Sequence, residues 1–324
     1  MADLAYRQAV AAALAQEMDR DPTVVMIGED IGPAGGVFKA TVGLFERFGP
    51  QRVWDTPISE QAIIGAAMGG AMTGVRPVAE IMFSDFLATC WDGVANEIAK
   101  MRYMTGGQVC LPLVIRCANG GGVHFGAQHS QSVENWAMAV PGLKVVAPAT
   151  PADMKGLLAA AIRDDDPVVV FEHKALYATT GEVPDGEHVL PLGQAARVRE
   201  GGDVTLVSLA AGVGVATEAA EGLAAEHGIE AEVIDLRCLM PLDAQSVLAS
   251  LERTGRLVIV EETPRQLGWG AELTSVVVEE GFDLLDAPIA RVATASIPLP
   301  ATPALESLAR PSAARVVKTV TSLL

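Results

Sequence analysis

Short apolar runs rich in Val and Ile alternate along the chain with segments whose apolar residues recur every three or four positions. Such runs are typical of strands, and the recurrence is typical of helices with one buried face. In the first half of the chain, strands are predicted at residues 23–27, 76–83, 111–117, 143–146 and 167–171. Helices are predicted at residues 6–19, 59–72, 86–104 and 152–163. This alternation indicates a parallel sheet with helices on both faces.

The alternation pauses over a polar stretch rich in turn-forming residues and then resumes. Further strands are predicted at residues 204–209, 231–236, 257–261 and 289–293, with helices at 216–226, 242–251 and 271–279. We therefore expect an α/β protein with two parallel-sheet domains, residues 1–177 and 194–324, joined by a linker at residues 178–193.

The charge of the chain excludes several classes of function. Its 324 residues include 40 acidic and 23 basic side chains, a formal net charge of −17. This surplus repels phosphate backbones, so nucleic-acid binding is disfavoured. No apolar run approaches the roughly 18 residues of a membrane-spanning helix, and the most apolar stretch, residues 61–75, is predicted to be a buried helix.

Cysteine usage and the first residues point to a cytoplasmic protein. The chain begins without the basic and apolar regions of a signal peptide. The four cysteines are scattered and form no C-x-x-C pair, so we expect buried, reduced thiols at Cys90, Cys110, Cys117 and Cys238.

Several nucleotide-binding and hydrolytic motifs are absent. The glycine-rich segment Asn119–Gly126 follows a predicted strand but does not fit G-x-G-x-x-G. No Walker sequence, H-E-x-x-H or G-x-S-x-G occurs. A hydride-transferring Rossmann enzyme, a P-loop protein and a stand-alone nucleotide-binding protein are therefore poorly supported.

An acidic residue opens the apolar helix. Glu60 ends the segment Asp-Thr-Pro-Ile-Ser-Glu and lies in the predicted first turn, with Ser59 as the N-cap. An acidic side chain there complements the helix dipole, which is worth about 0.3–1 kcal/mol. A carboxylate that leads into a buried helix is also desolvated unless a polar group meets it. From the residues alone, the dipole explanation is favoured.

Two further clusters carry candidate chemistry. His124 and His129 lie on the glycine-containing loop 123–131, and loops at sheet ends collect catalytic residues. No cysteine or carboxylate neighbour supports metal binding by this pair. Met82 and Phe86, in the stretch 79–86, are explained most simply as core residues.

Taken together, these clusters match one family in order and spacing. The matching stretches are Gly28-Glu-Asp, Gly35-Gly-Val-Phe-Lys, Asp55-Thr-Pro-Ile-Ser-Glu, Arg76-Pro-Val-Ala-Glu, Arg102-Tyr-Met-Thr-Gly-Gly, Gln128-His-Ser-Gln, Pro141-Gly-Leu-Lys-Val-Val and Lys155-Gly-Leu-Leu-Ala-Ala-Ala-Ile. Over essentially its whole length, the chain resembles the beta subunit of the decarboxylating first component of thiamine-diphosphate-dependent 2-oxo acid dehydrogenase complexes.

The resemblance implies a fold and a set of partners. It implies a transketolase-like pyrimidine-binding domain followed by a transketolase C-terminal domain. In this family an alpha subunit holds the diphosphate and Mg²⁺ through a Gly-Asp-Gly motif, which this chain lacks. The chain would then supply half of each active site in a heterotetramer with alpha subunits and a second beta chain. The complete enzyme, an oxidoreductase, would pass the acyl group to lipoyl on an acyltransferase core.

The resemblance also implies residue roles. Glu60 falls on the catalytic glutamate that hydrogen-bonds the aminopyrimidine ring of the cofactor, and His129 on an active-site histidine near the substrate and the lipoyl arm. Met82 and Phe86 fall where apolar side chains contact the pyrimidine. Backbone carbonyls around four residues match a structural potassium site, namely Leu113, Ala161, Asp164 and Asp166. A solvated turn is the simpler explanation for the three consecutive aspartates, residues 164–166.

One position departs from the family, and the substrate stays open. Pro298-Leu-Pro is followed by Ala301, where the family usually has an aromatic residue. Pyruvate is the default substrate, acetoin cleavage is a close alternative, and branched-chain 2-oxo acids come third. A catalytically silent scaffold subunit is the alternative of another class, although Glu60 and His129 argue against it.

Overall fold

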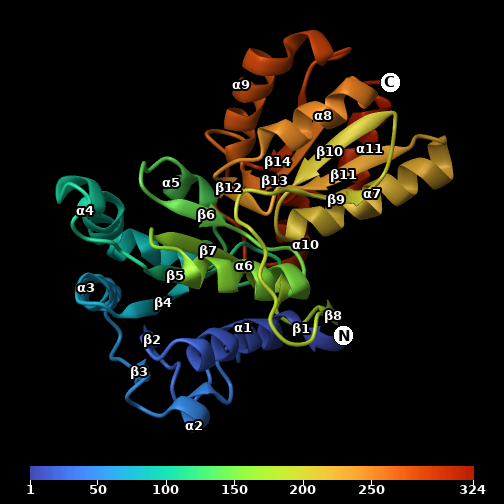
Figure 1. The fold of residues 1–324 in the computed structure, drawn as a ribbon. Coiled ribbons are helices and arrows are strands. Elements are labelled where there is room, and N and C mark those ends of the chain that lie inside the picture. The colour runs from blue at the N-terminus through green and yellow to red at the C-terminus, as the bar shows by residue number, and fades with distance from the viewer. The chain divides into compact units, whose positions relative to one another are not determined.

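Residues 1–324 are all described by a computed structural model, in which strands and helices alternate much as predicted (Figure 1). The chain divides into two units. The first comprises residues 1–119 and 136–192, and the second comprises residues 120–135 and 193–324. The loop 120–135 therefore clusters with the second unit, which no feature of its sequence indicated.

The strands of the first unit pair in the order β6-β7-β5-β4-β2-β3, and every pair is parallel. Strands β2, β5 and β7 are buried along their whole length, which explains why their residues do not alternate in polarity. The bounds are β2 Val24–Gly28, β3 Val53–Asp55, β4 Arg76–Phe83, β5 Val114–Asn119, β6 Lys144–Val146 and β7 Val168–His173.

Three of the four helices predicted for this part of the chain are confirmed, as α1 Tyr6–Arg20, α3 Glu60–Met72 and α6 Pro151–Arg163. The structure adds the short helices α2 Leu44–Phe48 and α5 Glu134–Met138, which were not predicted, and α4 Ala99–Met104. Helices α1 and α6 pack together, and Arg163 donates to the fully buried carboxylate of Glu17 at 2.8 and 2.9 Å. Helix α6 begins as its sequence dictates, because Thr150 Oγ1 accepts a hydrogen bond from the amide of Asp153.

The single helix predicted over residues 86–104 is wrong. The segment opens as a 3-10 helix, Ser84–Thr89, and continues through a π-helix, Gly93–Ile98, into α4. Apolar spacings of three and four residues do not distinguish these helix types. The π-helical turn brings Gly93 so close to α3 that a Cβ at Gly93 would lie 3.1 Å from the Ile64 side chain.

Helix α3 is not buried on all sides within this chain, contrary to the expectation from its composition. Ile63, Ile64, Ala67 and Ala71 are buried. The opposite face is exposed and, apart from Gln61, consists of small or flexible apolar residues, Ala62, Gly65, Ala66, Gly69 and Met72. The apolar composition of α3 correctly predicted that the face packed on the sheet is buried. No other part of this chain covers its opposite face.

Two short strands and one thiol also differ from expectation. Strand β1, Ala2–Ala5, pairs antiparallel with β8, Thr180–Val183, so part of the predicted linker is ordered. Both segments are four residues long, too short for a recognisable alternation. The predicted domain limits at residues 177 and 194 stay a prediction. Three cysteines are buried as expected, whereas Cys110 is exposed.

The sheet of the second unit has the order β14-β13-β10-β11-β9 and is parallel except for the edge strand β9. Its strands are β9 Ala196–Arg199, β10 Val204–Ser208, β11 Ala231–Asp235, β13 Leu257–Pro264 and β14 Ala290–Thr294. The short strand β12, Cys238–Met240, is not part of this sheet. The helices are α7 Ala211–His227, α8 Ala244–Thr254, α9 Trp269–Gly281, α10 Pro303–Ala309 and α11 Ala313–Thr321.

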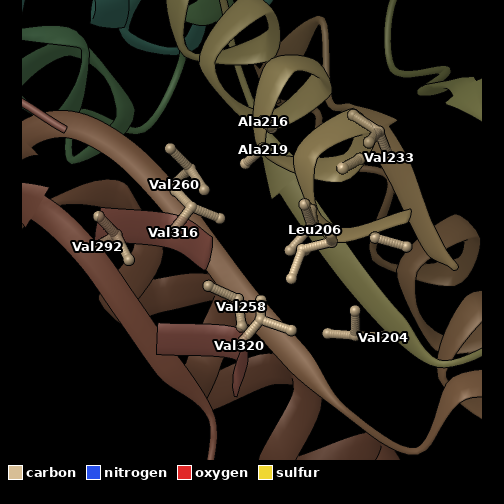
Figure 2. Packing of buried hydrophobic residues seen from close by; sticks show 13 residues of the cluster. Val204, Leu206, Ala216, Ala219, Val233, Val258, Val260, Val292, Val316 and Val320 are labelled. Carbon is tan, nitrogen blue, oxygen red and sulfur yellow. The ribbon is translucent and has the colours of Figure 1, made fainter. Parts of the chain in front are cut away.

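The core of this unit lies between the sheet and helices α7 and α11. Figure 2 shows Leu206 of β10 amid Val204, Val233 and Val258 from the central strands, with Val316 and Val320 of α11 nearby. Small alanines of α7, among them Ala216 and Ala219, let that helix approach the sheet closely. None of the helices in either unit is long and apolar enough to cross a bilayer.

We expect Leu206→Ala to lower the free energy of unfolding by about 2–5 kcal/mol, because Leu206 is fully buried and its truncation leaves a cavity. Chemical denaturation of the purified chain measures this change. Leu308→Ala, at a position that is 75% exposed, is the matched control and should change stability by no more than about 0.5 kcal/mol. Equal losses for the two variants would contradict the assignment of this core.

Candidate functional site

Four candidate side chains lie at the carboxyl ends of the parallel strands of the first unit. Glu29 directly follows β2, and Glu60 opens α3 after β3. Met82 is the penultimate residue of β4, and Phe86 lies in the 3-10 helix that follows it. Because parallel strands end at the same edge of a sheet, these residues share the edge at which α/β proteins bind ligands.

Glu60 is the first residue of α3 and is half-buried. Ser59 occupies the N-cap position as predicted, but its side chain makes no capping hydrogen bond. The charge of Glu60 acts on two neighbours. Burial, and then Glu60, raises the pKa of the Cys90 thiol to about 12. Burial and then Glu60 also raise the pKa of Glu29. The carboxylate of Glu60 therefore belongs to an acidic cluster.

Glu29 is a site residue that sequence reasoning missed. Its side chain is 7% exposed, and its Oε2 has no hydrogen-bond partner within the chain. Burial is the largest cause of its raised pKa, followed by the charges of Glu60, Asp30 and Glu80. The available signal was a carboxylate placed directly after the wholly apolar strand Val24–Gly28, where a charge is costly unless it has a role.

An aromatic cluster adjoins the acidic residues. The rings of Phe83 and Phe86 meet edge to face at 5.5 Å, and Phe38 meets Phe83 at 5.6 Å. Phe38 also stacks on Tyr177 at 4.9 Å. Met82 and Phe86 are half-buried, so each presents part of its apolar surface outward from this cluster. Such a surface can hold a flat ring and exclude water from it.

A buried arginine fixes the carboxylates behind Met82. Arg116 donates from Nε and Nη2 to Glu172 at 2.6 and 2.9 Å and from Nη1 to Glu80 at 2.8 Å. The Tyr177 hydroxyl donates to Glu172 at 2.9 Å. Burial raises the pKa of Glu80, against the opposing effect of Arg116. Met82 and these four polar side chains line one small crevice.

His129 lies in the second unit, on the loop 120–135. It is half-buried, and its backbone amide donates to the carbonyl of Gly126 at 3.3 Å. Ala301, the position that departs from the expected aromatic residue, faces the same loop, because a Cβ at Gly126 would lie 3.5 Å from the Ala301 Cβ. Glu60, Met82 and Phe86 thus come together in the first unit, whereas His129 belongs to the second.

The residues predicted for potassium are Leu113, Ala161, Asp164 and Asp166. The carbonyl of Asp164 accepts from Arg76 at 3.0 Å, and its carboxylate accepts from Lys144 at 2.6 and 2.8 Å. The carbonyl of Leu113 accepts from the amide of Val168 at 3.0 Å. A carbonyl oxygen has two lone pairs, so these oxygens keep some capacity for a cation. The segment 164–166 is an ion-paired turn rather than a freely solvated one.

A hollow of about 340 Å³ lies apart from Glu60, Met82 and Phe86, and Asp165, within the segment 164–166, is part of its lining. Its lining includes Met72 at the end of α3 and Arg76 at the start of β4, which belong to the amino edge of the sheet. The guanidinium of Arg76 is already engaged with the carbonyls of Ile162 and Asp164 and with Asp165. No group of three or more His, Cys, Asp or Glu side chains is arranged to hold a metal ion.

Comparisons with known proteins agree with this architecture. The family model of the transketolase pyrimidine-binding domain matches residues 2–180, and that of the transketolase C-terminal domain matches residues 193–316. Among solved structures, a split-gene transketolase described as an inactive beta4 tetramer superposes with a TM-score of 0.82 at 26% identity, covering 99% of this chain and 98% of that one.

Three relatives show the closeness in sequence. Subunit beta of acetoin:2,6-dichlorophenolindophenol oxidoreductase from Cupriavidus necator is 47% identical over 323 residues, covering 97% of this chain and 95% of that one. The 2-oxoisovalerate dehydrogenase subunit beta of Bacillus subtilis is 44% identical, with 94% of each chain covered. The pyruvate dehydrogenase E1 component subunit beta of Rickettsia conorii is 44% identical, covering 98% and 97%.

The raised pKa of Glu29 generates a test by pH. The pKa of Glu29 lies above its ordinary value of 4.5 in the native protein, so Glu29 keeps its proton to a higher pH there than in the unfolded protein. Native stability must then fall as pH rises from 4.5 through the raised pKa, and it stays lower above it. We expect Glu29→Gln to be more stable than the parent at neutral pH, with the difference vanishing toward acid pH.

Denaturation curves between pH 4 and pH 8 measure this difference, and Glu97→Gln at an exposed helical position is the control. A stability difference between the parent and Glu29→Gln that does not change with pH would rule out the assigned burial cost of Glu29.

Proposed function

The chain belongs to the family of beta subunits of the first component of 2-oxo acid dehydrogenases, and on that premise we propose how its own residues serve the reaction. The parent reaction is the oxidative decarboxylation of a 2-oxo acid with acyl transfer to a lipoyl group, and pyruvate is the default substrate. The observation that carries the proposal is Glu60, half-buried on the carboxyl edge of the sheet beside buried Glu29 and the apolar pair Met82 and Phe86.

These residues fit the aminopyrimidine end of thiamine diphosphate. Glu60 would share a proton with a ring nitrogen, and Met82 and Phe86 would hold the ring and exclude water from it. The buried Oε2 of Glu29, which lacks a partner within the chain, adds a second carboxylate whose raised pKa suits it to hold a proton. When bound, the cofactor supplies the electron sink that decarboxylation needs.

We assign the second catalytic role to His129. Its imidazole would donate a proton to the developing alkoxide of the substrate or to a lipoyl sulfur, a kind of help worth about 10²–10⁴-fold in rate. The supporting observation is that its loop directly follows strand β5 along the chain.

We propose that an alpha subunit completes the site and holds Mg²⁺ with the diphosphate. Two observations support this. The chain has no Gly-Asp-Gly motif, and the five small or flexible apolar residues on the outer face of α3 leave space for another backbone. A second beta chain and a lipoyl-bearing acyltransferase core complete the proposed assembly.

The choice of substrate depends also on the alpha subunit, which shares the specificity pocket. Identities of 47% to the acetoin enzyme and 44% to the pyruvate and branched-chain enzymes do not rank the substrates. Co-expression with the alpha chain, followed by assays with a dye acceptor, would separate pyruvate, acetoin and 3-methyl-2-oxobutanoate. Turnover of none of the three would contradict the proposed activity.

Glu60→Gln should lower the rate of decarboxylation in the assembled complex by about 10²–10⁴-fold, because an amide cannot share the proton that a carboxylate can. Glu97→Gln, at an exposed helical position, is the matched control and should retain the parent rate. Near-normal decarboxylation by Glu60→Gln would remove the proton role and favour the alternative of a silent scaffold subunit.

We further propose a potassium ion on the carbonyls around Leu113, Ala161, Asp164 and Asp166. An ion that binds only the native state raises its stability with concentration. The thermal midpoint should therefore rise with KCl and respond less to tetramethylammonium chloride at the same ionic strength. Identical thermal midpoints in the two salts would contradict bound potassium and would mean that Arg76 and Lys144 alone stabilise the turn 164–166.

A further inference from the structure

Two amides of the glycine-rich segment Gly120–Gly122 donate to carboxylates of the same chain, whereas the amide of Gly120 donates to the carbonyl of Gln131 at 3.0 Å. The amide of Gly121 donates to Glu262 Oε1 at 2.6 Å, and the amide of Gly122 donates to Glu306 Oε1 at 2.6 Å. The amide of His124 donates to Glu306 Oε2 at 3.2 Å. Converging backbone amides often bind an external anion. Here the two glutamates already take that place.

The two carboxylates hold the loop 120–135 at two places, residues 121–124 and Ser132. Glu306 comes from α10 and is 1% exposed, and Glu262 comes from β13. Ser132, beyond His129 in the chain, donates its hydroxyl to Glu262 Oε1 at 3.2 Å. Arg310, which is half-buried, donates to Glu262 Oε2 at 2.7 Å, so its charge offsets part of that of the two carboxylates. His124 Nδ1 also contacts Glu306 Oε2.

The backbone conformation at Gly122 favours glycine, and Arg310 packs closely against it. Gly122 has φ +88, and a Cβ there would lie 2.6 Å from Arg310 Nη1. His124 adopts φ +63, a left-handed conformation that is unfavourable for a non-glycine residue and persists only where surroundings impose it. Its amide and its ring both contact Glu306, which supplies that restraint.

We propose that Glu306, assisted by Glu262 and Arg310, is a positioning residue that holds the loop 120–135 so that His129 meets the substrate. The span that contains His129 lies between two clamped points, His124 and Ser132, and clamping both ends removes most of its conformational freedom. A displacement of about 1 Å at a reacting group can cost about 10²-fold in rate. This inference rests on the proposed role of His129.

The test compares Glu306→Ala with the parent in the complex assembled with the alpha chain. Hydrogen–deuterium exchange of residues 120–131 reports loop order without reference to activity. We expect this segment to exchange at least about tenfold faster in the variant. We also expect kcat to fall by about 10–100-fold while KM changes by less than about threefold, because the loop is displaced rather than the pyrimidine site.

Two further variants sharpen the result. Ser307→Ala, on the exposed side of the same helix, is the matched control and should change neither exchange nor kcat. Glu306→Gln keeps the size of the side chain but offers one acceptor oxygen in place of two, so it should produce an intermediate loss. It also serves as the test if Glu306→Ala fails to fold or assemble.

The outcomes separate this inference from the proposed function. Unchanged exchange in Glu306→Ala or Glu306→Gln would overturn the clamp. Faster exchange with unchanged kcat would overturn the positioning role of Glu306. The activity of His129→Ala then shows whether the role of His129 is also wrong. If His129→Ala also keeps its activity, the proposed function of His129 is wrong, whereas if it loses activity, only the positioning by Glu306 is wrong.

Discussion

Parallel pairing of β2, β3 and β4 brings the ends of three strands to one edge of the first sheet, and the candidate site depends on this constraint. Glu29, Glu60 and the pair Met82 and Phe86 come from three separate parts of the sequence, yet each lies near or just beyond the end of one of these strands. Register decides which residues emerge there. A shift of one residue in β4 would turn Met82 to the opposite face.

The same edge gathers charges that repel one another. Burial of Glu29 beside Glu60 and Glu80 raises its pKa, so folding carries a cost there that a structural role does not explain. Arg116 offsets part of this cost by binding Glu80 and Glu172. Breaking such a buried pair leaves an uncompensated charge, which typically costs about 3–5 kcal/mol. Arg116 therefore holds Glu80 and Glu172 in place.

The second unit uses carboxylates in a different way. Glu262 and Glu306 accept hydrogen bonds from backbone amides and so order a loop, instead of presenting a charge to a ligand. This arrangement gives the C-terminal half of the chain a direct part in the chemistry proposed for His129. It also explains a glycine-rich segment that fits no nucleotide-binding motif.

The sequence by itself determined the alternation of strands and helices, the two α/β domains and the family, because burial on a sheet imposes local periodicities and motifs keep their order along the chain. It marked Glu60, Met82, Phe86 and His129 through their motifs. Only the tertiary structure revealed the buried Glu29, the exposed face of α3 and the clamp by Glu306. Burial, charge coupling and capture of a loop by a residue 182 positions away depend on neighbours in space, and no local pattern encodes those neighbours.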